Sequence, residues 1–245
     1  MSVVTVEERG PVSIIAINRP EKLNAINKAV AVELQSAFAA FDRSAQRVAI
    51  LAGKGGKAFS SGADVADLPE LWRCVPTVGI KTDKPIIAAV SGWCIGGGLV
   101  MAMMCDLLVA ADTARFSYPE GKIGITGGMI AGLAARIPHK VAMEMLILCR
   151  SLDAQRAYSV GFANEVVPTG QQVERALAMA REIATFSPVV LKTLKRFVTE
   201  GVLPQGPSER MARAHRDLGL VRDSADAQEA VVAFKEKRKP RFSGR

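Results

Sequence analysis

The chain has 245 residues, of which 49% are hydrophobic, and carries a formal net charge of +8 at pH 7. This length and composition are enough for one large domain with a sizeable core and exclude global disorder. Only two histidines are present, His139 and His215, so neither a histidine-based catalytic triad nor a zinc site is favoured, and we expect no metal.

The first part of the chain alternates between predicted strands and helices. Short runs of apolar and β-branched residues predict strands, and helical spacing of Val32, Leu34, Phe38 and Phe41 predicts a helix over Lys28–Phe41. The predicted strands are Val12–Ile17, Val48–Leu51, Pro85–Val90 and Leu107–Ala110. This alternation implies an α/β protein whose strands are buried on both faces.

After about residue 140 the sequence becomes helical in character. Ser187 with Pro188, and Ser224 with Asp226, are typical of helix starts. The predicted helices are Val141–Leu148, Asp153–Val160, Val173–Thr185, Pro188–Thr199, Ser208–Leu220 and Ala225–Lys237. We therefore divide the chain into a core, residues 1–185, and a C-terminal helical region, residues 186–245.

Residues 86–105 form an uncharged run that is long enough to cross a membrane. Ser91-Gly92 and the triple glycine Gly96-Gly97-Gly98 divide this run into a strand, a turn and a helix, which favours buried core. Glycines at a helix start let a ligand approach the backbone, and the free N–H groups there point at it. The triple glycine therefore indicates an oxyanion hole, for which Phe59–Asp64 offers a second donor.

The cysteines and the charge distribution bear on location and partners. The four cysteines, Cys74, Cys94, Cys105 and Cys149, show no metal-ligand spacing, and the polar residues 1–9 do not resemble a signal peptide. We expect free thiols in a reducing, cytoplasmic environment. Residues 232–245 contain six basic residues and one acidic residue, which suits a phosphate-bearing ligand, nucleic acid or anionic lipid, or a solvated helix end. We expect neither nucleic acid nor membrane as a partner.

Several motifs in order resemble the crotonase family, the enoyl-CoA hydratase/isomerase superfamily. They are residues 18–25 (NRPEKLNA), 56–64 (GKAFSSGAD), 84–90 (KPIIAAV) with the triple glycine, Pro119-Glu120, 161–167 (GFANEVV) and 234–238 (FKEKR). The resemblance covers nearly the whole chain. It implies a crotonase-like spiral of ββα units with a C-terminal helical trimerisation region, in homotrimers or homohexamers, and an acyl-CoA substrate with no separate cofactor.

The resemblance also assigns roles to particular residues. The backbone N–H groups of Ala63 and Gly97 are implied to hold the thioester oxygen of an acyl-CoA, and Glu120 to be the catalytic carboxylate. Coenzyme A is expected to bind near Ala63 and further residues; these are Lys22, Ala25, Ser61, Asp64, Val65 and, from a neighbouring subunit, Lys237. For Asp64 we favour a role in a turn or cap over one in catalysis.

Hydratases of this family carry a second glutamate, on the helix after the triple glycine, where this chain has Val100. Glu120 still provides proton transfer at C2 of the substrate. Valine can neither donate nor accept a proton, so the group that would hold the water in a hydratase is lost. This pattern favours an enoyl-CoA isomerase, or a hydratase with a reduced site that uses Tyr118 or Thr126. Gly128 stands about where other members carry a catalytic aspartate, which argues against dienoyl-CoA isomerase and dehalogenase chemistry. The segment between Asp64 and Lys84 is shorter than is typical of the family, so the wall of the acyl pocket is expected to be trimmed or open.

Two further functions stay open at this stage. The chain could bind an acyl-CoA with little turnover, because a fold does not secure an activity. Alternatively it could hydrolyse a thioester or a C–C bond.

Overall fold

The computed structural model describes residues 2–244. Its larger sheet has six strands in the order β1-β2-β3-β5-β7-β10. The strands are β1 (Val4–Arg9), β2 (Val12–Ile17), β3 (Val48–Gly53), β5 (Ile86–Val90), β7 (Leu107–Ala111) and β10 (Glu165–Val167). β1 is antiparallel to β2, and the other neighbouring pairs are parallel.

A smaller sheet has the order β4-β6-β8-β9. Its strands are β4 (Ala58–Ser60), β6 (Trp93–Ile95), β8 (Arg115–Ser117) and β9 (Leu152–Asp153). β4, β6 and β8 each directly follow a strand of the larger sheet, so the chain steps from one sheet to the other and then to a helical segment. Repetition of this step produces a spiral of ββα units.

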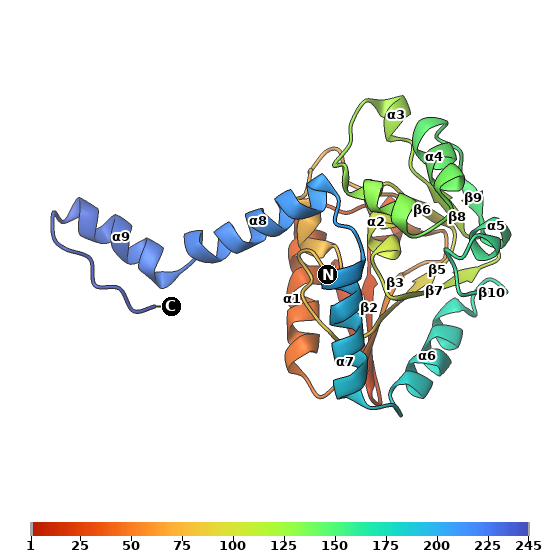
Figure 1. Cartoon of the computed structure of the whole chain (residues 1–245), viewed down its shortest axis with the longest axis horizontal. Coiled ribbons are helices and arrows are strands. Elements are labelled where there is room, and N and C mark those ends of the chain that lie inside the picture. The colour runs from red at the N-terminus through yellow and green to blue at the C-terminus, as the bar shows by residue number, and fades with distance from the viewer. Residues whose placement is uncertain (1, 245) are drawn as a thin grey trace.

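Helices cover both faces of the larger sheet (Figure 1). In β2, Ile15 and Ile17 join a core cluster with α1 and α2, while Ile14 and Ala16 join a second cluster with α6. Alternate side chains point to opposite faces, which explains why β2 is buried along its whole length. The helices are α1 (Lys28–Arg43), α2 (Gly97–Met103), α3 (Glu120–Ile123), α4 (His139–Ile147), α5 (Ala154–Ser159), α6 (Gln172–Ile183), α7 (Pro188–Arg196), α8 (Pro207–Arg222) and α9 (Ala225–Lys235).

The last helices leave the core. α7 lies along it, whereas α8 and α9 extend away from it as an arm (Figure 1). A turn of π-helix, Phe197–Val202, follows α7 and precedes this arm. The boundary that we drew at 185/186 falls between α6 and α7. The division into two units stays a prediction.

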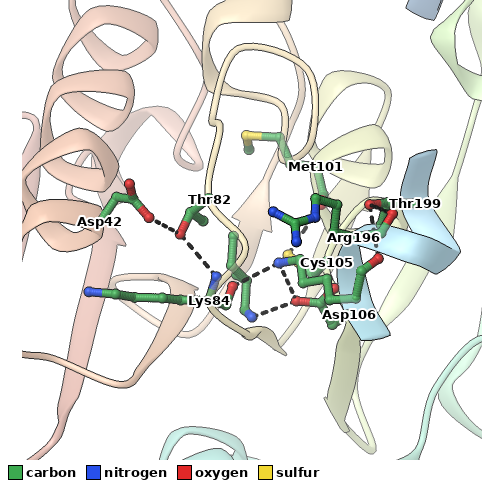
Figure 2. Close-up of polar contacts among 10 residues, drawn as sticks. Asp42, Thr82, Lys84, Met101, Cys105, Asp106, Arg196 and Thr199 are labelled. Atoms are coloured by element: carbon green, nitrogen blue, oxygen red, sulfur yellow. Dashed lines mark hydrogen bonds and ion pairs between the residues drawn. The ribbon is translucent and has the colours of Figure 1, made fainter. Parts of the chain in front are cut away.

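A network of polar contacts fastens α7 to the core (Figure 2). Asp106 Oδ2 accepts hydrogen bonds from the Ile86 N–H and from Lys195 Nζ, both at 2.7 Å. Lys195 Nζ also donates to the Lys84 carbonyl at 2.7 Å. Lys84 itself is only 5% exposed, and its Nζ donates to the carbonyls of Phe41 and Ser44.

The predicted elements match the structure, but the six-residue strand β1 and several short strands were not predicted. The strands and helices predicted from periodicity all occur, with ends that differ by a few residues. The sequence run 86–105 contains β5, β6 and α2, and no helix within residues 2–244 is long and apolar enough to cross a membrane. All four cysteines are free thiols.

Candidate active site

The two predicted donors lie on facing segments. Ala63 forms a parallel bridge with Ile26, in which the Ile26 N–H donates to the Gly62 carbonyl and the Asp64 N–H donates to the Ile26 carbonyl. The residues on either side of Ala63 make these bonds, so the N–H of Ala63 points away from Ile26. Gly97 is the first residue of α2, where the helix offers its N–H no acceptor.

Two glycines with positive φ bring the donor segments together. Gly62 has φ +91°, and a Cβ there would lie 3.4 Å from the Gly97 nitrogen. Gly96 has φ +53° and a Cβ there would lie 3.9 Å from the Gly62 Cα. Any larger residue would be strained and would separate the segments. The structure thus brings the segments that carry Ala63 and Gly97 together.

Glu120 lies against the same turn. It is the first residue of α3, and a Cβ at Gly96 would lie 2.7 Å from its Oε1. Its Oε2 is buried and has no hydrogen-bond partner within the described residues. A buried carboxyl oxygen without a partner is costly, so its presence beside the two donors indicates a functional position.

Burial raises the pKa of Glu120 to about 7, and a backbone hydrogen bond opposes this shift. A carboxyl that titrates near neutral pH can both accept and return a proton. The pKa of Tyr118 is also raised, first by burial and then by the charge of Glu120, which places the two side chains in one electrostatic environment.

Two other polar side chains near Glu120, Tyr118 and Thr126, are hydrogen-bonded to each other. The hydroxyls of Tyr118 and Thr126 share a hydrogen bond of 2.7 Å, and the Gly128 N–H donates to Thr126 Oγ1 at 3.0 Å. Val100 is 2% exposed and packs in the main core cluster. A Cβ at Gly128 would lie 2.3 Å from Ser208 Oγ, so α8 fills the space beside that residue.

The residues predicted to contact coenzyme A fall into two groups. Ser61 lies beside Lys22, since its Oγ donates to the Lys22 carbonyl at 3.5 Å. Ala25 and Asp64 are joined by Arg19, which sequence reasoning missed: its Nη1 donates to the Ala25 carbonyl at 2.7 Å and to Asp64 Oδ2 at 3.1 Å. No signal in the sequence relates Arg19 to Asp64, because the two residues lie 45 positions apart.

Asp64 has the local contacts of a turn residue, because its Oδ1 accepts from the Ala66 N–H at 3.2 Å. Val65 is 74% exposed and follows directly. Lys237 lies beyond α9, on the arm that leaves the core (Figure 1), so within one chain it does not join the other predicted residues.

A cavity of about 580 Å³ lies elsewhere, between the end of α2 and helices α7 and α8. None of the predicted site residues lines it. Among residues 2–244, no group of three or more His, Cys, Asp or Glu side chains is placed to hold a metal ion. The cavity also holds an acid and a donor without partners, because Glu209 Oε1 and Arg213 Nε are buried and unpaired within the described residues. We take the Ala63–Gly97–Glu120 region as the candidate site because two backbone N–H groups and a buried acid come together there.

The two sheets, the spiral of ββα units and the C-terminal helices define a protein of the crotonase fold. Enoyl-CoA hydratase from Mycobacterium tuberculosis H37Rv has a similar structure, with a TM-score of 0.77 and 35% identity over 100% of both chains. Carnitinyl-CoA hydratase from Mycobacterium avium has a similar structure too, with a TM-score of 0.78 and 33% identity over 100% of both chains. Crotonyl-CoA hydratase of Syntrophomonas wolfei is 32% identical over 98% of this chain and 97% of its own.

The family model described as enoyl-CoA hydratase/isomerase matches residues 7–245. The chain therefore belongs to the enoyl-CoA hydratase/isomerase family and is an enzyme of the crotonase superfamily that acts on acyl-CoA.

Proposed function

We propose that this enzyme shifts a double bond in an enoyl-CoA, with Glu120 as its single proton-transferring group. The observation that carries the proposal is the approach of Glu120 Oε1 to Gly96, at the turn where the segments that present Ala63 and Gly97 meet. A base at this position can reach C2 of a thioester whose carbonyl oxygen accepts from both N–H groups.

The proposed reaction needs little else. Glu120 removes a proton from C2 of a 3-enoyl-CoA, and the electrons of that C–H bond move onto the thioester oxygen. The Ala63 and Gly97 N–H groups stabilise this charge, and a single oxyanion donor is typically worth about 3 kcal/mol. Glu120 then returns the proton at C4, which leaves the double bond between C2 and C3. No water is consumed.

Val100 supports isomerisation over hydration, because the buried valine has no polar atom to hold a water. Hydration is the second candidate. The similar proteins above are named hydratases, and the Tyr118–Thr126 hydroxyl pair is the nearest polar alternative to a second carboxylate. Acyl-CoA binding with little turnover, and hydrolysis of a thioester or C–C bond, are the remaining alternatives.

We propose that the coenzyme A part of the substrate lies along Lys22, Ala25, Ser61 and the Asp64–Val65 turn. The ammonium group of exposed Lys22 suits a phosphate. Lys237 would contribute from a second copy of the chain, since the arm carries it away from its own core.

We also propose a homotrimer or homohexamer built through the arm. α8 and α9 extend from the core with exposed apolar side chains, among them Leu220 at 72% and Phe234 at 85%. Such surfaces mark protein contacts. Light scattering coupled to size-exclusion chromatography measures the assembly, and a monomeric mass would refute this part of the proposal.

The experiment that tests the reaction compares a 3-enoyl-CoA with its 2-enoyl isomer by following the absorbance of the conjugated thioester. We expect absorbance to appear from the 3-enoyl substrate and to persist with the 2-enoyl substrate. Loss of absorbance from the 2-enoyl substrate, with formation of a 3-hydroxyacyl product, would instead establish hydration. Neither signal, together with tight binding of the ester, would favour the binding or hydrolytic alternative.

The Glu120→Gln variant is the matched control. It keeps the shape of the side chain and removes its basicity, so turnover should be lost while the affinity for the CoA ester stays close to that of the wild type. Full activity in this variant would exclude Glu120 as the base.

A further inference from the structure

We propose that Leu71 is a specificity-determining residue, which forms the wall of the acyl pocket nearest the thioester and disfavours substituents at C2. The inference rests on the proposed function, because it needs the thioester oxygen to lie at the Ala63 and Gly97 N–H groups. It assigns the substrate class as enoyl-CoA esters that are unbranched at C2.

The side chain of Leu71 lies directly against Gly97. A Cβ at Gly97 would be 2.7 Å from Leu71 Cδ1 and 3.0 Å from Cδ2. Ile26 Cδ1 is the next nearest atom, at 3.5 Å. The two methyl groups of Leu71 thus cover the Cα of the residue that presents one of the two donors.

The backbone that carries Leu71 is held in place. Leu71 begins the 3₁₀-helix Leu71–Cys74, in which Cys74 Sγ donates to the Leu71 carbonyl at 3.2 Å. Cys74 and Val75 are completely buried, and the Val75 N–H donates to the Trp72 carbonyl. Residues 71–75 are therefore anchored in the core, and Leu71 cannot move away without disturbing buried residues.

This position determines which acyl groups fit. An oxygen that accepts from the Gly97 N–H lies about 3 Å from that nitrogen. The thioester carbon and C2 are one and two bonds further on, within reach of the Leu71 methyl groups. Glu120 approaches the same glycine turn at Gly96 and needs access to a hydrogen on C2. A flat, unsubstituted C2 fits between the two side chains, whereas a methyl group on C2 competes with Leu71 for space.

The test measures binding of two unreactive saturated esters, butyryl-CoA and 2-methylbutyryl-CoA, to the wild type and to Leu71→Ala by titration calorimetry. We expect the wild type to bind butyryl-CoA at least tenfold more tightly. One methylene group in an apolar pocket typically changes preference by about 10- to 200-fold. Leu71→Ala should reduce this preference by about tenfold or more, and Leu71→Val should give an intermediate ratio.

Leu68→Ala is the matched control, because Leu68 lies on the same segment but is 56% exposed, and its ratio should equal that of the wild type. An unchanged ratio in folded Leu71→Ala and Leu71→Val, or equal binding of both esters by the wild type, would overturn the role of Leu71. If the wild type bound neither ester, the proposed function itself would fail. Circular dichroism verifies the fold of each variant.

Discussion

The Cα of Gly96 lies so close to Glu120 that a Cβ at this position would be 2.7 Å from Oε1 of the carboxylate. Gly96 also has φ +53°, which side-chain-bearing residues adopt only at a cost of about 1–3 kcal/mol. One glycine therefore permits both the turn into α2 and the seating of the proposed base beside the donors.

Gly96→Ala should for this reason lower the rate of proton transfer, because the added methyl group displaces Glu120. We expect kcat to fall at least tenfold in the assay for the conjugated thioester. Gly10→Ala is a matched control, since Gly10 has φ +65° with nothing within 4 Å of a Cβ. It should lose stability to a similar extent and keep its kcat. Equal kcat in the two variants would contradict this account.

The pKa of Glu120 predicts the pH dependence of turnover. The carboxylate is the active form, and burial raises its pKa to about 7. The value of kcat/KM should therefore rise with pH through a midpoint near 7 and then level off. A midpoint near the ordinary value of 4.5 would mean that the carboxyl is solvated in the working enzyme.

The raised pKa of Glu120 also predicts that the stability of the fold decreases as pH rises. Between about pH 4.5 and 7 the unfolded chain has released the Glu120 proton while the folded chain retains it. This group therefore contributes a loss of stability as pH rises through that window. Denaturant titrations of the wild type and Glu120→Gln should diverge in favour of the variant as pH rises, and parallel curves would exclude a raised pKa.

Val100→Glu restores the second glutamate of family hydratases and tests whether the pocket can hold a water beside position 100. The new carboxyl should increase hydration of a 2-enoyl-CoA if the pocket still admits water beside Val100. Stability should fall as well, because position 100 is 2% exposed and burial of a carboxyl is costly. Val100→Gln is the matched control, with a similar side chain but no basicity. No gain over this control in folded protein would mean that the pocket holds no water there.

The contact between α7 and the core can be tested through two adjacent basic residues. Lys195 donates to both Asp106 and the Lys84 carbonyl, so Lys195→Met should lower the free energy of unfolding by roughly 1–3 kcal/mol. Arg196 lies next in the chain and pairs with Asp83 at 3.6 Å, with side chains that are 49% and 41% exposed. Arg196→Met should change that free energy by less than about 1 kcal/mol. Equal effects in thermal or urea denaturation would contradict the proposed anchoring.

Local patterns in the sequence determined the long elements and the start of α2. The buried run Val12–Ile17 and the helical periodicity after Lys28 contain their own signal, because the apolar period reflects the side of the element that faces the core. Strands as short as β4, β6 and β8 have three residues each, too few to establish a period, and they form through pairing with distant segments. The site residues came from the resemblance to the crotonase family, whose motifs occur in order along the chain.

Only the tertiary structure decided what surrounds each of those residues. Glu120 gains its raised pKa from burial in the folded chain, and the donors meet because Gly62 and Gly96 approach each other just after the paired strands β4 and β6. No local pattern relates Leu71 to Gly97 or Arg19 to Asp64. The sequence by itself determined which groups are available for chemistry, whereas distance and solvent exclusion, which decide what those groups do, arise only when the chain is folded.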